Sequence, residues 1–134
     1  MSTSPKGPRV YLASKLYHAP MWRDWKANKK LGITIVSTWH DNINIEADDH
    51  DIAACRSGWI ENICDIRGAD AMLVYGMREE ALNGTLVEIG AALHSGVDVY
   101  LVGTYPWGTW RHLRKVNHSP DLHTAIHDIR QDLS

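Results

Sequence analysis

The chain carries four short runs of nearly continuous apolar residues, separated by stretches long enough to hold helices. These runs are Val10–Ala13, Ile33–Val36, Ala71–Tyr75 and Val97–Val102. Strands with one wet face alternate apolar and polar residues, whereas strands buried on both faces are apolar throughout. The runs therefore predict strands of a parallel sheet that is covered on both sides.

Helical patterns lie between these runs. The clearest spans residues 52–66, where apolar side chains recur at spacings of three and four: Ile52, Cys55, Trp59, Ile60, Ile63 and Ile66. A second pattern covers residues 21–31 and is closed by Gly32, since glycine readily adopts the left-handed conformation that ends many helices. Each pattern predicts a helix with one face on the sheet.

Two further helices are expected in the second half of the chain. One covers residues 85–95 and ends before Gly96. The other begins with Ser119 as N-cap and Pro120 as its first residue. Strand and helix therefore alternate, which favours right-handed βαβ crossovers. We expect an α/β fold: a doubly wound, Rossmann-like or flavodoxin-like sheet, mostly parallel, of four to five strands flanked by helices, with ligands outside the carboxyl ends of the strands.

Composition limits the domain count and disfavours several classes of partner. The Pro-, Gly- and Ser-rich residues 1–8 predict a flexible terminus ahead of a single domain over residues 9–134. A net charge of −2 offers no basic face to a nucleic-acid polymer or an anionic membrane, and no apolar run has transmembrane length. Cys55 and Cys64 form no CxxC motif, which fits a reducing compartment. We therefore expect a cytoplasmic protein.

Motifs for bound cofactors and metals are missing from the sequence. It contains neither GxGxxG nor GxxxxGK[ST], so a dinucleotide cofactor or an NTPase reaction has no support. His123 and His127 share a helix face, but HExxH is absent and no third ligand is in register. Solvated surface histidines are the better interpretation, and we expect no cofactor and no metal.

Glu88 is the only charged residue in segment 83–90, where the loop after the third expected strand meets a helix. Thr85 followed three residues later by Glu88 fits a capping box, which is a structural role. The alternative is catalytic, because a carboxylate in the first helical turn is held ionised by the helix dipole at the ligand-binding end of the sheet. Such a carboxylate can attack an anomeric carbon and form a glycosyl ester.

Three segments and their spacing resemble the nucleoside 2-deoxyribosyltransferase superfamily, which also contains nucleotide N-glycoside hydrolases. They are VYLAS at the first strand, DIRGAD ending at Asp70, and GTLVEIGAAL around Glu88. The resemblance spans residues 10–102 and implies a domain that cleaves the N-glycosidic bond of a nucleoside or nucleotide. It implies Glu88 as the nucleophile and Tyr11 beside it, orienting it, unless Tyr11 only completes its strand. Asp70 is expected to fix the turn before the third strand.

The same resemblance gives further candidates and one departure. Many members carry an Asp where this chain has Asn62, and Asn cannot exchange a proton as a carboxylic acid does, although it can hydrogen-bond a sugar or a base. Neighbouring Glu61 and Asp65 are expected to point elsewhere on the helix. Asn83 and Gly84, before the next helix, are candidates for binding the sugar, with a turn or cap role as the alternative.

Polar and aromatic residues after the first two strands are candidates for binding the substrate. Trp39 directly follows the second strand and could stack on a nucleobase, while His40 and Asp41 could hydrogen-bond it. Alternatively, Trp39 covers the end of the core. Ser14, after the first strand, could meet a phosphate if the ligand is a nucleotide.

The loop over residues 105–112 holds Trp107 and Trp110 among Gly and Pro residues. Two Trp in such a loop are unusual in contact with solvent, so we expect them to line a pocket or a subunit interface. Six Trp in a small domain also exceed what one core readily hides. We therefore expect a homodimer or a higher homo-oligomer.

These observations leave two classes of function. The first is an enzyme, a nucleoside deoxyribosyltransferase or a related N-glycosidase, which acts on a small nucleoside or nucleotide through Glu88. Transfer follows if a second base intercepts the glycosyl-enzyme, and hydrolysis follows if water does. The second, motivated by Asn62, is a module of the same fold that binds a nucleotide without turning it over.

Overall fold

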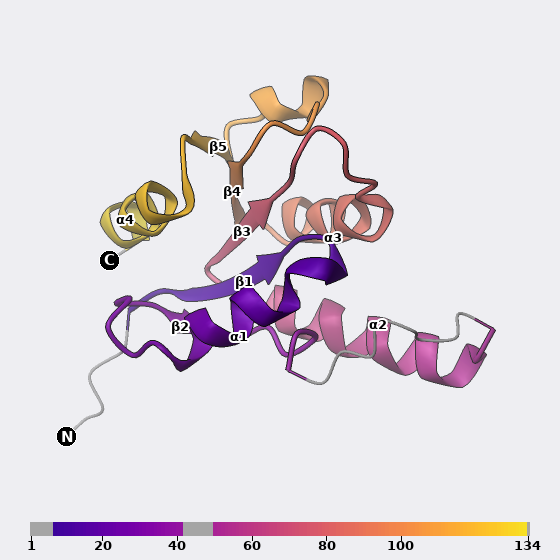
Figure 1. Ribbon diagram of the computed structural model, residues 1–134. Coiled ribbons are helices and arrows are strands. Elements are labelled where there is room, and N and C mark those ends of the chain that lie inside the picture. The colour runs from indigo at the N-terminus through magenta and orange to yellow at the C-terminus, as the bar shows by residue number, and fades with distance from the viewer. Residues whose placement is uncertain (1–6, 42–49, 134) are drawn as a thin grey trace.

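The computed structural model describes residues 7–41 and 50–133, in which strands and helices alternate along the chain (Figure 1). In these residues five strands form one sheet: β1 (Arg9–Ala13), β2 (Thr34–Ile35), β3 (Ala71–Tyr75), β4 (Asp98–Val102) and β5 (Val116–Ser119). All neighbouring strands are parallel, in the order β2-β1-β3-β4-β5. This is the flavodoxin-like order of a doubly wound sheet, so the expected fold class is confirmed.

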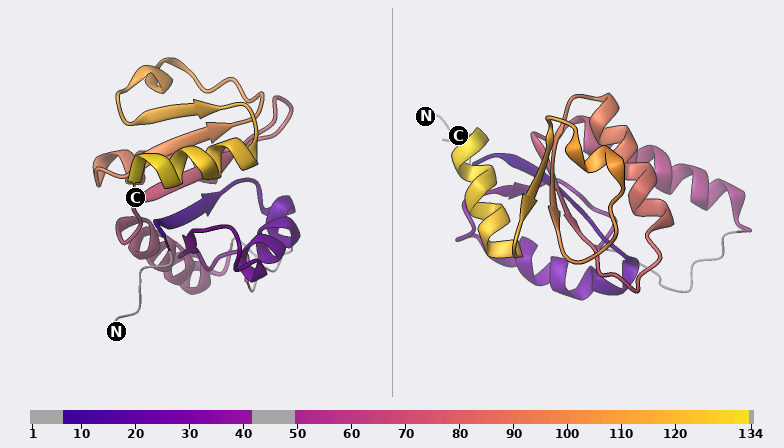
Figure 2. Two further views of the ribbon diagram at one scale, coloured as in Figure 1. Left: turned by 90° about the vertical axis from the view of Figure 1, so that its left-hand side faces the viewer. Right: turned by 90° about the horizontal axis from the view of Figure 1, so that it is seen from above.

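Helices cover both faces of the sheet (Figure 2). The described residues form α1 (Ala19–Ala27), α2 (Ile52–Arg67), α3 (Asn83–His94) and α4 (Leu122–Leu133), with short 3₁₀ helices η1 (Leu16–His18) and η2 (Thr109–His112). Trp22 of α1 and Ile129 of α4 pack in one apolar layer, and Ile66 of α2 and Ile89 of α3 pack in the other. The sheet therefore separates an α1–α4 side from an α2–α3 side.

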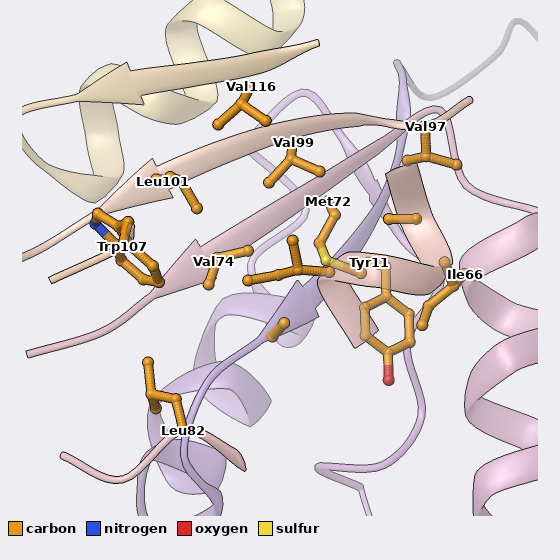
Figure 3. Close-up of a cluster of buried hydrophobic side chains, with 13 residues drawn as sticks. Tyr11, Ile66, Met72, Val74, Leu82, Val97, Val99, Leu101, Trp107 and Val116 are labelled. Carbon is orange, nitrogen blue, oxygen red and sulfur yellow. The ribbon is translucent and has the colours of Figure 1, made fainter. Parts of the chain in front are cut away.

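Alternation along β1 sends neighbouring side chains to opposite sides of the sheet. Leu12 belongs to the α1–α4 layer, whereas Tyr11 belongs to the α2–α3 layer. Figure 3 shows the ring of Tyr11 beside Ile66, among the buried side chains of that layer. The β1 position of Tyr11 thus aims its hydroxyl toward the helices α2 and α3.

The first helix differs from its expected bounds. It begins before residue 21 because Pro20 occupies its first turn, and it ends at Ala27, so Gly32 does not close it. Gly32 does adopt a positive φ of 77°, but in the turn before β2. This left-handed conformation favours glycine, and a Cβ there would also lie 2.5 Å from Nε of Arg130.

The expected strand over residues 33–36 is reduced to β2. Opposite its end, Leu12 is held by side chains: its N–H donates to Ser37 Oγ at 3.1 Å, and its C=O accepts from Trp39 Nε1 at 2.7 Å. Side chains therefore replace the backbone ladder at this edge, which an apolar pattern alone does not reveal.

The last strand and the start of the last helix also differ from the prediction. No apolar run marks β5, whose sequence is VNHS, and Ser119 belongs to this strand rather than to a helix cap. The Ser119 hydroxyl donates to Asp128 at 2.9 Å. Asp121 caps α4 instead, because its carboxylate accepts the N–H of Thr124 at 2.7 Å.

The start of the structured part lies earlier than expected. Residues 1–6 of the predicted flexible terminus lie outside the described residues, but Pro8 is buried and its C=O accepts the N–H of Thr34 at 2.9 Å. The domain therefore begins before residue 9. Within the described residues, no helix is long and apolar enough to cross a membrane.

The apolar stripe expected on α2 is mostly not core. Ile66 is buried, but Ile52 and Ile60 are 68% and 58% exposed, and Trp59 also lies at the surface. The helix begins and ends almost where the periodicity predicts. Only its last turn packs into the layer under the sheet, because α2 extends beyond the sheet, as Figure 1 shows.

Candidate functional site

Glu88 lies on α3, which follows the carboxyl end of β3. The helix begins at Asn83, so Thr85 lies inside it and no side chain caps its start. The capping-box interpretation is therefore wrong, and so is the placement of Glu88 in the first turn, because it lies in the second. Glu88 is only 7% exposed, and a cap does not account for this burial.

The hydroxyl of Tyr11 donates a hydrogen bond to Oε2 of Glu88. The expected proximity of the two side chains is confirmed, although 77 residues separate them along the chain. Oε1 of Glu88 has no hydrogen-bond partner within the described part of the chain, and it is not a fully enclosed atom there. Among the described residues, one carboxylate oxygen is therefore held by Tyr11 and the other has no hydrogen-bond partner.

Burial controls the ionisation of this pair. Desolvation raises the pKa of Glu88 from 4.5 to about 7, and the hydrogen bond from Tyr11 acts in the opposite direction. Burial, together with the charges of Glu88 and Asp65, raises the pKa of Tyr11 far above its usual value. The pair therefore combines a carboxylate that titrates near neutral pH with a hydroxyl that stays protonated. Carboxylates tuned in this way are typical of catalytic sites.

Two acidic side chains of α2 contact Thr38, and one of them, Asp65, also lies near Tyr11. The Thr38 hydroxyl lies 2.8 Å from Oε1 of Glu61 and 2.9 Å from Oδ2 of Asp65. Asp65 is also near enough to raise the pKa of Tyr11. The expectation that Asp65 points elsewhere was therefore wrong, whereas Glu61 has only Thr38 as its partner. Asn62, between them on α2, is half-buried and makes no side-chain hydrogen bond within the described residues.

Two candidates from the loop after β2 are engaged inside the protein. His40 is fully buried, its Nε2 lies 2.8 Å from Ser37 Oγ, and burial lowers its pKa to about 4. Asp41 accepts from Nζ of Lys26 at 2.7 Å, and its other oxygen lies 3.4 Å from Nδ1 of His40. The structure does not bring His40 to a ligand, and Asp41 is occupied by Lys26. Residues 42–49 of this loop lie outside the described residues.

Trp39 and Ser14 also have internal partners. Trp39 is half-buried against both apolar layers, and its N–H binds the C=O of Leu12, so it covers the end of the core. Oγ of Ser14 accepts from Nε1 of Trp22 at 2.7 Å, on the α1 side. The structure therefore does not bring Ser14 together with Glu88.

The start of α3 is more open. Asn83 and Gly84 are its first two residues, and both are exposed. The ring of Trp59 from α2 lies over Gly84, 3.6 Å from the position a Cβ would take. Trp59 was expected in the core, but it is 36% exposed and presents an aromatic surface beside the start of α3. Helical periodicity could not distinguish it from a core residue, because only the placement of α2 exposes it.

The tryptophan loop covers the core of its own chain. Trp107 is only 7% exposed, and its ring lies 5.0 Å from that of Tyr105 and 6.2 Å from that of Trp110. It also packs on Gly76, where a Cβ would come within 2.7 Å of the ring. Trp107 therefore covers the core of its own chain, while Trp110 beside it is half-buried.

Asp70 has the structural role expected of it. Its carboxylate accepts the N–H of Arg9 at 2.8 Å, and its own N–H donates to the C=O of Arg9 at 2.7 Å. These two bonds join the turn before β3 to the start of β1. By fixing the register of the two strands, Asp70 contributes to the position of Tyr11 without being part of the site.

Fold and site together define a doubly wound α/β protein with a buried, titrating carboxylate on the helix after β3. A 2-deoxyribosyltransferase from Bacillus psychrosaccharolyticus has a similar structure, with 20% identity and a TM-score of 0.65 over 91% of this chain and 90% of its own. A conserved protein from Enterococcus faecalis V583 is similar over 95% and 99%, with 16% identity and a TM-score of 0.53. No family model and no curated protein sequence matches the chain. The resemblance to the nucleoside 2-deoxyribosyltransferase superfamily therefore holds at the level of the fold.

Proposed function

We propose that this protein cleaves the N-glycosidic bond of a nucleoside or nucleotide by double displacement. In the first step Oε1 of Glu88 bonds to the anomeric carbon, while the bond to the base nitrogen breaks and its electron pair leaves with the base, which takes up a proton. In the second step a nitrogen of another base, or a water oxygen, attacks the same carbon and Glu88 departs as a carboxylate. The observation that carries this proposal is a buried carboxylate with one oxygen held by Tyr11 and the other unbonded within residues 7–41 and 50–133.

The role proposed for Tyr11 follows from its fixed protonation. A hydroxyl that cannot ionise is a permanent donor, and it keeps Oε2 of Glu88 in place so that Oε1 faces the substrate. The 2-deoxyribosyltransferase of the same fold supports nucleosides as the substrate class. Asn83, Gly84 and Trp59, at the start of α3, are proposed to contact the sugar or the base.

A panel assay tests the proposal directly. The protein is incubated with 2′-deoxynucleosides and their 5′-phosphates, with and without a free acceptor base, and base release and exchange are followed by chromatography. Release of the base only when the acceptor base is present indicates transfer. Release of the base without an acceptor indicates hydrolysis. Binding of these compounds without any release would favour the second candidate function, a nucleotide-binding module, for which Asn62 is the motivating observation.

The departing base requires a proton, and Asn62 cannot supply one. We expect Asn62→Asp to raise turnover by tenfold or more, because general acid assistance contributes about 10²- to 10⁴-fold. Glu61 and Asp65 nearby would help to keep the new carboxyl protonated. Initial rates of base release measure the effect. Asn28→Asp makes the same change of residue at the end of α1, on the other side of the sheet, and is the control. Equal rates in all three proteins would show that another donor already fills the role.

We further propose a homodimer that forms through α2 and α3. These adjacent helices expose six apolar side chains, each at least 36% accessible: Ile52, Trp59, Ile60, Ile63, Leu86 and Val87. Exposed apolar side chains concentrated in one region are typical of interfaces. We expect Ile60→Asp to raise the dimer dissociation constant at least tenfold, measured by sedimentation. Leu113→Asp, at an equally exposed site before β5, should leave it unchanged. A parent protein that sediments as a monomer at micromolar concentration would refute the proposal.

A further inference from the structure

A cavity of about 1150 Å³ opens at the amino-terminal edge of the sheet. Its walls come from the end of α1, the residues around β2 and the last turns of α4. Figure 2 shows α1 and α4 on the same side of the sheet. Glu88 and the ring of Tyr11 belong to the other side, so the sheet separates this cavity from the candidate site.

The charges around the cavity have one sign. Lys26, Lys29, Arg130 and His127 line it, and its lining includes no Asp or Glu. Lys26 is paired with Asp41. In the described part of the chain, Lys29 and Arg130 have no carboxylate within 4.0 Å. As far as the structure describes the chain, two cations therefore face the cavity without an acidic partner, and a cleft with such charges attracts anions.

One wall of the cavity is aromatic and apolar. The indole of Trp25 is half-buried and stacks on His123, with ring centroids 5.6 Å apart and planes inclined at 29°. Ile33 and Ile35 continue this wall. A small inorganic anion would leave these surfaces unused, whereas a planar ring attached to an anionic group would contact both the aromatic wall and the cations.

The side chain of Arg130 lies close to the backbone at the rim of the cavity. Gly7 and Gly32, with φ of 83° and 77°, approach so closely that a Cβ on Gly7 would lie 1.9 Å from the carbonyl oxygen of Gly32. The Arg130 side chain lies against Gly32, where a Cβ would meet its guanidinium at 2.5–2.7 Å. Gly32 thus leaves room for the Arg130 side chain at the edge of the cavity.

We infer that this cavity is a second ligand site, which binds a nucleoside 5′-phosphate with its phosphate at Lys29 and Arg130 and its base along Trp25. The guanidinium of Arg130 can bind two phosphate oxygens at once, and Lys29 supplies a second positive charge. The volume is ample for a ligand of this size. The inference does not depend on the activity proposed for Glu88, because it concerns the opposite side of the sheet.

The test follows the indole N–H signal of Trp25 by NMR, assigned with Trp25→Phe, in a Glu88→Gln background that prevents turnover. The probes are the four 2′-deoxynucleoside 5′-monophosphates, the corresponding nucleosides and inorganic phosphate. We expect a monophosphate to shift this signal at sub-millimolar concentration. Lys29→Glu with Arg130→Glu should weaken binding at least tenfold, since a charge-assisted hydrogen bond contributes about that factor. Single Lys29→Gln and Arg130→Gln variants give the same comparison with less change in charge.

Arg114→Glu is the matched control, because Arg114 is an exposed cation before β5, outside the cavity. It should bind the monophosphate within twofold of the parent. Three results would each overturn the inference. The first is no shift of the Trp25 signal even at a monophosphate concentration roughly tenfold above the sub-millimolar range. The second is binding of nucleosides or inorganic phosphate as tight as that of the monophosphates, and the third is equal weakening by Arg114→Glu. None of these readouts involves base release, so they are separate from the test of Glu88.

Discussion

Replacing Glu88 by Gln is expected to stop base release, with a loss of roughly 10³-fold or more, as found when an enzyme loses its nucleophile. An amide cannot form the glycosyl ester and leave again as a carboxylate. The fold should persist, because the amide oxygen can still accept the hydroxyl of Tyr11. Chromatography of the released base measures the rate. Turnover within twofold of the parent would end the assignment of Glu88 as the nucleophile.

The same substitution should stabilise the folded protein at high pH, although it abolishes activity. The pKa of Glu88 is about 7 in the folded protein against an ordinary 4.5, so the folded protein binds this proton more tightly than the unfolded chain does. Stability is therefore lost as pH rises from below 4.5 through 7, by about 3 kcal/mol in total. Glu88→Gln removes this cost. In urea unfolding at pH 8 the variant should be more stable than the parent, and at pH 4 the difference should disappear. A variant that is less stable at pH 8 would indicate a structural role for the carboxylate.

Most of the fold could be predicted from local pattern. Three of the expected strands match β1, β3 and β4 closely, because strands buried on both faces must be apolar throughout. The strands at the two edges of the sheet were harder to predict. β2 shortens because the side chains of Ser37 and Trp39 replace its ladder, and β5 is invisible because its sequence VNHS contains one apolar residue.

The pair Tyr11–Glu88 could be anticipated from the family resemblance, but the physical reason given for Glu88 was wrong. A helix dipole in the first turn was expected to keep Glu88 ionised, whereas Glu88 lies in the second turn, where burial raises its pKa and one hydrogen bond lowers it. Burial depends on how helices pack, which residue spacing does not contain. For the same reason the sequence pattern does not reveal that the placement of α2 brings Asp65 near Tyr11 and the ring of Trp59 over Gly84.

Several polar residues that follow strands were expected to bind the substrate, but the structure gives them partners inside the protein. The carboxyl end of a sheet gathers loops, but many of their polar side chains serve the fold. His40 and Ser14 illustrate this, since the first is wholly buried against Ser37 and the second accepts from Trp22. A hydrogen-bond partner elsewhere in the chain decides such cases, and only the structure supplies it.

The ionisation of Glu88 should make kcat/KM depend on pH. Glu88 attacks as a carboxylate, so kcat/KM should rise with pH through about 7 and level off above it. The hydrogen bond from Tyr11 lowers the pKa of Glu88, and Tyr11→Phe removes it. The rising limb should therefore move to higher pH in Tyr11→Phe. At pH 6 we expect the variant to lose about 10- to 10²-fold in rate, the factor associated with one hydrogen bond to a charged group, and to recover part of this loss at pH 9.

Tyr100→Phe provides the control for this profile. The hydroxyl of Tyr100 also donates to a carboxylate, that of Asp132 at 2.7 Å, but on the α1–α4 side of the sheet. Removing that hydroxyl should leave the pH of the rising limb where it is in the parent. If Tyr11→Phe lowers the rate equally at every pH, Tyr11 only positions Glu88. If Tyr100→Phe moves the limb as far as Tyr11→Phe does, the limb belongs to a group other than Glu88, and the ionisation proposed for the nucleophile is wrong.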